Sequence, residues 1–260
     1  MTFADAKQRF SNRVADYIRY RPSYPSALLD LLRAECRLRP DHVIADIGSG
    51  TGFLSELLLK NSNRVFGVEP NAEMRAGGEE YLNTYRNFSS VDGSAEATTL
   101  PAASVDFIAA GQAFHWFDPQ TAHREFLRIL KPLGWVVIVW NDRRMDEAQL
   151  TREYEVLLER FGLDYKRVKD AYPERAQIQS FIAGPFIERD LPNHQSLDWD
   201  GFQGRLRSSS FAPTEGHPNF APMIAELDRI FRAHQHDGRV RMEYFTRAFL
   251  GQLHTAGTEA

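Results

Sequence analysis

The sequence of 260 residues contains one cysteine, Cys36. A single cysteine forms no intramolecular disulfide and cannot build a zinc site on thiolates, so the chain fits a reducing compartment. None of the eight histidines is separated from another by the His-x-x-x-His spacing of a helical metal site. We therefore predict no metal.

Long apolar runs are also missing. The longest strongly apolar stretch, Trp135–Trp140, is far too short to cross a bilayer. The N-terminal segment MTFADAKQRF has no apolar run typical of a signal peptide. We expect a cytoplasmic protein that is neither exported nor anchored.

Neither sign of charge dominates the chain. The chain contains 31 Lys and Arg and 35 Asp and Glu, which gives a formal net charge of -4. Partners such as nucleic acid or an anionic membrane usually require a basic excess or a basic tract. The near balance of positive and negative charge argues against nucleic acid and against an anionic membrane as partners. The hydrophobic share of 43% is typical of a globular protein with one large domain and an insertion or a small cap.

From about residue 41, short β-branched runs alternate with helix-like segments. This order is typical of βαβ units, and hence of a mostly parallel sheet with helices on both faces. Apolar stripes at helical spacing support two of the helices, Leu54 to Leu58 and Ala122 to Leu130. Asp118 and Pro119 mark the start of the second helix. The predicted strands are 42–47, 64–69, 105–111 and 134–140, with a weaker one at 86–92.

The two ends of the chain depart from this alternation. A helical leader rich in aromatic residues and arginine covers about 10–24, and an amphipathic helix follows at 26–37. Beyond residue 141 we expect helices near 154–161 and 223–231 and an antiparallel strand pair formed by 186–197 and the segment from Val240. We divide the chain into a leader or lid (1–40), a core (41–141) and a C-terminal part that completes the sheet and adds a helical cap (142–260).

The sharpest motif is a buried strand that runs into a turn dense in glycine, Asp46-Ile-Gly-Ser-Gly-Thr-Gly52. Glycines let the main chain turn tightly and let a ligand approach without meeting Cβ atoms. A dinucleotide fingerprint would place its third glycine at position 53, which is Phe53, and the lysine of a P-loop is absent. A tight turn with no ligand is the alternative interpretation.

This motif resembles the first motif of the class I S-adenosylmethionine-dependent methyltransferases. The resemblance of the chain to that family extends over roughly residues 10–141. The leader Tyr17-Ile-Arg-Tyr-Arg-Pro-Ser-Tyr24-Pro and the segment Phe114-His-Trp-Phe-Asp118 are similar to type 11 methyltransferases, near enzymes that methylate small carboxylic acids such as trans-aconitate. The resemblance implies a Rossmann-like α/β fold. Its sheet would have seven mostly parallel strands with an antiparallel last strand.

The resemblance also implies S-adenosylmethionine as cofactor and S-adenosylhomocysteine as product. Glu69 ends the second strand, where a carboxylate can accept both hydroxyls of a ribose. The loop after the third strand matches the family's adenine loop, and the segment after the fourth strand lies at the same edge of the sheet. The expected cofactor-binding residues are Tyr17, Arg21, Asp46, Gly48, Ser49, Gly50, Gly52, Glu69, Pro70, Asn71, Met74, Ser94, Ala95, Glu96, Gln112, Ala113 and Phe114.

The acceptor pocket is less defined. We predict Tyr24, His115 and Trp116 as its residues, with His115 as a candidate proton acceptor; alternatively His115 and Trp116 simply pack under the following helix. Tyr17, Arg21 and Tyr24 either close over the cofactor or dock the leader on the sheet. The arginines after residue 141, including Arg143, Arg144, Arg205 and Arg207, either bind an acidic acceptor or belong to solvated faces.

The sequence therefore predicts a methyltransferase that acts on a small molecule, with a carboxylic acid as one class of acceptor. The alternatives are a methyltransferase for protein or RNA, a nicotinamide-dependent oxidoreductase, and a protein that binds the cofactor for regulation. The methylated atom and the state of assembly, monomer or homodimer, stay open.

Overall fold

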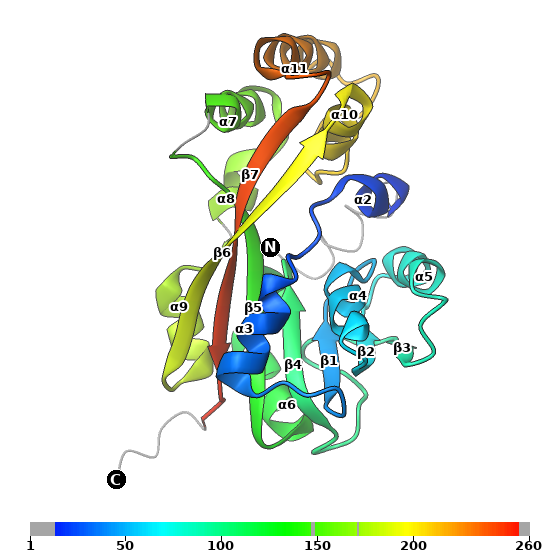
Figure 1. The fold of residues 1–260 in the computed structure, drawn as a ribbon, viewed down its shortest axis with the longest axis vertical. Coiled ribbons are helices and arrows are strands. Elements are labelled where there is room, and N and C mark those ends of the chain that lie inside the picture. The colour runs from blue at the N-terminus through cyan, green and yellow to red at the C-terminus, as the bar shows by residue number, and fades with distance from the viewer. Residues whose placement is uncertain (1–13, 147–148, 171, 255–260) are drawn as a thin grey trace.

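The computed structural model describes residues 14–146, 149–170 and 172–254. Seven strands form one sheet in the order β3-β2-β1-β4-β5-β7-β6 (Figure 1). Strands β1 to β5 pair in parallel, and β7 runs antiparallel to both of its neighbours. The strands are β1 (Val43–Ile47), β2 (Arg64–Val68), β3 (Phe88–Val91), β4 (Val105–Gly111), β5 (Leu130–Arg143), β6 (Phe186–Leu197) and β7 (Val240–Gly251). This is the Rossmann-like sheet that the resemblance implied, with an antiparallel last strand.

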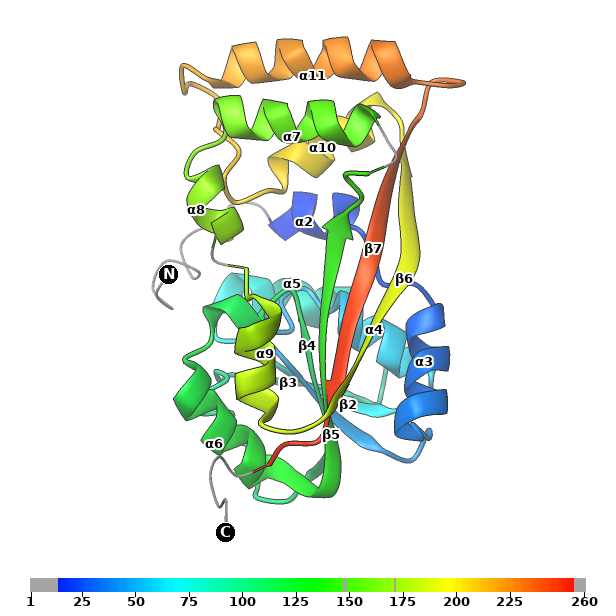
Figure 2. The same ribbon diagram turned by 90° about the vertical axis from the view of Figure 1, so that its left-hand side faces the viewer.

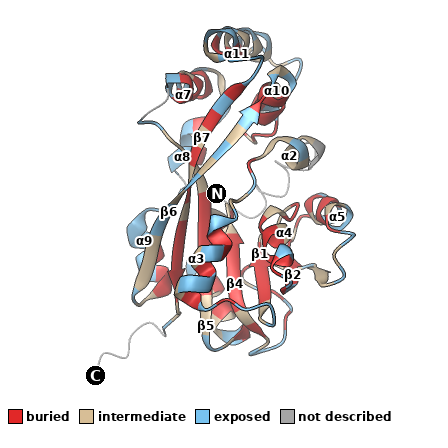
Figure 3. Ribbon diagram, viewed as in Figure 1, coloured by how far each residue is buried: buried red, intermediate tan, exposed pale blue. Residues whose placement is uncertain are grey.

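Helices cover both faces of the sheet, as the βαβ pattern predicted. Helices α6 (Pro119–Ile129) and α9 (Arg175–Ile182) lie on one face, and α3 (Ala27–Cys36) and α4 (Phe53–Lys60) lie on the other (Figure 2). Their apolar side chains pack against the strands. Helix α5 (Ala72–Tyr81) follows β2. Burial on both faces explains why the central strands read as continuous apolar runs (Figure 3).

A second apolar cluster forms a cap beyond one end of the sheet. It contains buried residues of α7 (Gln149–Phe161), α8 (Tyr165–Asp170), α10 (Trp199–Arg207) and α11 (Phe220–His234), together with the first residues of β7. Strands β5, β6 and β7 extend from the core to this cap (Figure 2). Helix α2 (Val14–Tyr20) packs between α10 and α5. The predicted leader residues 10–13 lie outside the described residues.

The ends of several elements differ from the sequence prediction. Strand β5 is longer than the predicted range 134–140, because its first residue, Leu130, already pairs with Val105 before a register shift. The short helices α8, α9 and α10 were not predicted. Across the described residues, no helix has both the length and the apolar character required to span a membrane.

Candidate functional site

The strand order reverses at β1, whose two neighbours are β2 and β4. Ligands of open parallel sheets bind at such a switch point, beside the carboxyl ends of the strands. The glycine loop Gly48–Gly52 leaves β1 there, and its three glycines have φ angles of 67°, 55° and 92°. These left-handed conformations suit glycine. At Gly48 a Cβ would lie 2.6 Å from the Cβ of Ala113, so the turn tolerates no side chain at this point.

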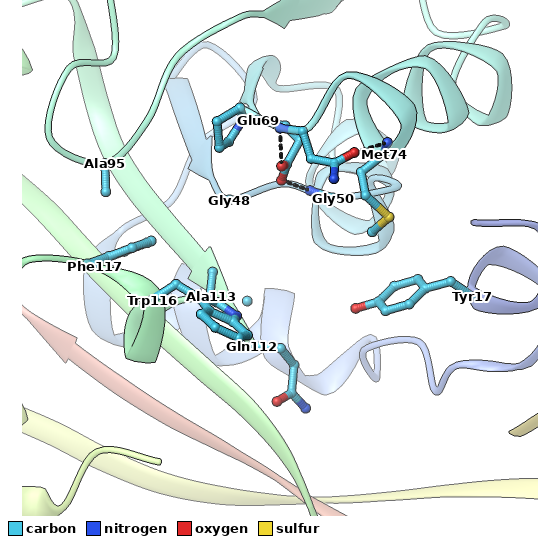
Figure 4. Close-up of a pocket in the computed structure, with 13 residues that line it drawn as sticks. Tyr17, Gly48, Gly50, Glu69, Met74, Ala95, Gln112, Ala113, Trp116 and Phe117 are labelled. Atoms are coloured by element: carbon cyan, nitrogen blue, oxygen red, sulfur yellow. Dashed lines mark hydrogen bonds between the residues drawn. The ribbon is translucent and has the colours of Figure 1, made fainter. Parts of the chain in front are cut away.

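Glu69, directly after β2, connects the glycine loop to the segment that precedes α5 by two hydrogen bonds. Its Oε2 accepts the N–H of Gly50 at 2.9 Å, and its Oε1 accepts the N–H of Asn71 at 2.8 Å (Figure 4). Asn71 in turn caps α5, because its side chain accepts the N–H of Met74. The carboxylate is 9% exposed and borders the first pocket described below. A carboxylate oxygen can accept more than one hydrogen bond, so a carboxylate at this position can bind main chain and ligand together.

A first pocket, with an empty volume of about 680 Å³, opens at these strand ends (Figure 4). Main chain and apolar side chains form most of its wall. It is lined by Tyr17, Gly48, Gly50, Glu69, Pro70, Asn71, Met74, Ala95, Gly111, Gln112, Ala113, Trp116 and Phe117. Most of the predicted cofactor residues are thereby brought together. The prediction missed Gly111 and Phe117. Phe117 belongs to the segment 114–118, from which the prediction chose the first three residues.

A second pocket of about 820 Å³ adjoins the first. The two share Tyr17, Gly48, Gly50, Gly111 and Gln112. The second pocket continues toward the cap and is further lined by Arg21, Pro22, Tyr24, Asp46, Ser49, Thr51, Phe53, Leu54, Asn141, Arg143, Tyr165, Tyr172, Arg205 and Phe211. Gln112, at the junction, has a φ of 57°, a conformation that side chains rarely adopt and that concentrates at functional sites.

Four predicted cofactor residues do not line either pocket. The Cβ position of Gly52 faces Leu82, and Ser94 pairs with Ala97 in a tight turn. Glu96 accepts the N–H of Asp118. Phe114 is 4% exposed and stacks edge-on against Phe181, because its ring belongs to the core under α6 and α9.

The predicted acceptor residues divide between the pockets. Tyr24 lines the second pocket, whereas Trp116 lines the first. His115 lines neither; its ring packs against those of Trp116 and Tyr172, at 4.8 and 5.1 Å between centroids. Burial lowers the pKa of His115 to about 4, which makes it a weak base at neutral pH. This environment favours the packing interpretation over a role in proton transfer.

Asp46, the last polar residue of β1, is 1% exposed. Its Oδ2 accepts the hydroxyl of Ser55 at 2.6 Å, and its Oδ1 has no hydrogen-bond partner in the described part of the chain. Burial raises the pKa of Asp46 to about 7, although the Ser55 hydrogen bond opposes this shift. A buried carboxylate of this kind is suited to a cationic ligand.

The leader combines the two roles proposed for it. Arg21 donates to the main-chain oxygen of Ser208 at 2.9 Å and lies over the ring of Tyr17, which stacks on Phe53. The leader is therefore docked between core and cap. Tyr17, Arg21 and Tyr24 nevertheless line the pockets, and the Nε of Arg21 is buried without a partner among the described residues.

Comparison with known proteins identifies the core. Residues 45–138 match the family model of a methyltransferase domain. An uncharacterized methyltransferase of Schizosaccharomyces pombe is 34% identical over 138 residues, and one of Mycobacterium tuberculosis is 35% identical over 143 residues. These alignments cover 52% and 54% of this chain, and the chain spans about half the length of these relatives (53% and 54%).

Solved structures share the fold over almost the whole chain. A proposed type II methyltransferase of Anaeromyxobacter dehalogenans superposes with a TM-score of 0.65 at 24% identity, covering 90% of this chain and 100% of that one. The structure of the YcgJ protein of Bacillus subtilis gives a TM-score of 0.55 at 19% identity, covering 88% and 99%.

The site also fits the cofactor of this family. Gly48, Gly50 and Glu69 line the first pocket, and the unpartnered Oδ1 of Asp46 in the second pocket suits a cation. The core of this chain, over residues 45–138, is therefore similar to a methyltransferase domain, and its site fits S-adenosylmethionine, the cofactor that the resemblance implied.

Proposed function

We propose that this chain transfers the methyl group of S-adenosylmethionine to a small carboxylic acid. The observation that carries the proposal is the pairing of the two pockets. The first has the bare glycine loop and Glu69, and the second, which adjoins it, contains three arginines. One suits the cofactor and the other suits an anion.

In this proposal the first pocket holds the adenosyl part of the cofactor. Glu69 accepts the ribose hydroxyls, and the apolar walls at Pro70, Ala95 and Phe117 enclose the base. Arg21 serves the cofactor carboxylate, because its guanidinium has an unpaired buried donor. The roles of Glu69, Ala95 and Arg21 are those predicted from the sequence, whereas Phe117 was not among the predicted residues.

S-adenosylmethionine supplies a methyl group that is already activated on a sulfonium. The residues of this chain then need to orient the acceptor and exclude water, which contributes on the order of 7–11 kcal/mol in well-oriented reactions. A carboxylate acceptor needs no general base. This agrees with the low pKa of His115, and it removes any need for a catalytic proton acceptor.

The second pocket supports a small acceptor with negative charge. Among the described residues that line it, three are arginines and Asp46 is the one carboxylate. The balanced charge of the whole chain, in contrast, offers little attraction to a nucleic acid or an anionic membrane.

A methyl-transfer assay with labelled donor tests the proposal. The panel contains small acids, each paired with its neutral amide, together with phenols and amines. We expect label in one or more acids and none in the matching amides. Transfer to amines or phenols alone, or no transfer to any acid, contradicts the proposal.

A further inference from the structure

Arg205 is the most deeply buried cation of the second pocket. It lies on α10 and is 4% exposed. Its hydrogen-bond partners are neutral: the hydroxyl of Tyr244 at 3.4 Å from Nε and the hydroxyl of Ser209 at 3.2 Å from Nη1. In the part of the chain that the structure describes, no carboxylate forms a salt bridge with it. A buried guanidinium whose partners are neutral is costly, and an anionic ligand would offset that cost.

Arg143, in the same pocket, provides the contrast. Its Nη2 donates to Oε2 of Glu155 at 2.8 Å and to the hydroxyl of Tyr165 at 2.6 Å. Glu155 also binds Lys169. Arg143 therefore has a carboxylate of the protein beside it, which Lys169 shares, although its Nε is buried without a partner among the described residues.

Arg21 adds a second unbalanced cation next to Arg205. Burial, and next the positive charge of Arg205, lower the pKa of Arg21, so the two guanidinium groups repel each other. Asp46 offsets them only in part, because burial raises its pKa to about 7 and its Oδ2 is bound to Ser55. Two cations that repel each other call for two anionic groups. The cofactor brings one carboxylate, and the second has to come from the acceptor.

We propose that Arg205 determines acceptor specificity by binding an anionic group of the acceptor, while Arg21 binds the carboxylate of the cofactor. This inference rests on the proposed function. The acceptor is then a molecule with a carboxylate that fits against α10. Arg143 acts as a fixed wall of the same pocket.

The probe for this inference is malonate, with malonamide as its neutral counterpart of the same skeleton. Both are added to protein saturated with S-adenosylhomocysteine, and the melting temperature is recorded. The variant is Arg205→Met. Its matched control is Arg207→Met, because Arg207 lies on the same helix and is exposed.

We expect malonate to raise the melting temperature of the wild-type protein and of Arg207→Met, and malonamide to have no such effect. Arg205→Met should bind malonate at least about tenfold more weakly, as loss of a charged hydrogen bond predicts. It should also melt no lower than the wild-type protein without ligand, because replacing an unbalanced buried charge by an apolar side chain removes its desolvation cost. A purely structural arginine would give the opposite result in the melt.

An equal malonate effect in Arg205→Met and the wild-type protein overturns the inference, as does a wild-type protein that ignores malonate. If Arg205→Met does not fold, Arg205→Gln replaces it in the same comparison. Failure of the proposed function is distinguishable, because it appears in the methyl-transfer assay as no label in any acid, whereas the comparison of Arg205→Met with the wild-type protein reports the binding of malonate alone.

Discussion

Glu69 connects the glycine loop to the start of α5 through two main-chain hydrogen bonds, and it faces the first pocket at the same time. A substitution here therefore affects the loop and the ligand together. Truncation to alanine would remove both functions at once, so a variant of the same shape is more informative.

We predict that Glu69→Gln weakens binding of S-adenosylmethionine and S-adenosylhomocysteine to the same extent, by about tenfold or more. The amide NH2 would face an N–H donor of Gly50 or Asn71, and the negative charge is lost. Isothermal titration measures both constants. Glu73→Gln, at an exposed position of α5, is the control and should bind normally. An unchanged constant in Glu69→Gln would mean that the ribose lies elsewhere.

Asp46 gives the site a pH dependence. In the free protein its pKa is raised from 3.8 to about 7 by burial, so the folded state holds a proton that the unfolded state releases. This group therefore makes the free protein less stable as the pH rises from about 4 to about 7. A cationic ligand favours the ionised form and expels the proton.

We predict that binding of S-adenosylmethionine releases protons near pH 7 and strengthens as the pH rises through this value. S-adenosylhomocysteine, which lacks the sulfonium charge, should release fewer. Titrations in buffers of different ionisation enthalpy count the protons. Asp46→Asn should remove the difference between the two ligands; proton uptake by the wild-type protein, or a difference between the ligands that persists in this variant, would refute the prediction.

Helix α10 carries Arg205 and begins at a defined cap. The side chain of Asp198 accepts the N–H of Gly201 at 2.8 Å, which satisfies one of the free donors of the first turn. The helix packs on α2 and α11 and so links the leader to the cap.

We predict that Asp198→Ala lowers the free energy of unfolding by about 1 kcal/mol, the usual effect of losing such a cap. Asp198→Asn retains an acceptor oxygen and should be close to the wild-type protein. Urea denaturation gives both values. Binding of S-adenosylhomocysteine should persist in both variants, since no contact of the first pocket changes; a loss of binding would show that α10 supports the cofactor site directly.

Sequence patterns predicted long elements well and short ones poorly. The range 186–197 agrees with β6, and the apolar stripe of α6 is buried as expected. Periodicity works there because the two faces of each element differ in how far they are buried. Helix α8 contains only six residues, too few for an apolar repeat to establish itself.

At the scale of the molecule, three strands join the core to the cap. Residues of β7 contribute to the apolar cluster of the cap at Val240–Tyr244 and to the core at Ala248–Leu250. Neither cluster can lose its packing without exposing part of the same strand. Because β7 belongs to both, we expect the core and the cap to form one folding unit.

We predict that core and cap unfold in a single transition. Tryptophan fluorescence and far-ultraviolet circular dichroism should give the same urea midpoint, and S-adenosylhomocysteine should move both curves together. Two separated midpoints would show that the cap unfolds independently.

The part of the site whose residues lie close together in sequence was predictable. The part assembled from distant segments was not. The glycine loop and Glu69 lie close together in sequence, and their strand context indicated their use. Arg21, Arg143 and Arg205 come from three distant segments, so their meeting in one pocket depends on the tertiary fold. From sequence alone, Arg143 and Arg205 could equally have belonged to solvated faces.

The central claim is that the strand ends at Gly48 and Glu69 bind an adenosyl cofactor. Isothermal titration of the wild-type protein with S-adenosylhomocysteine tests it most directly. The account predicts saturable binding of one molecule per chain; the absence of measurable heat at millimolar ligand would contradict it.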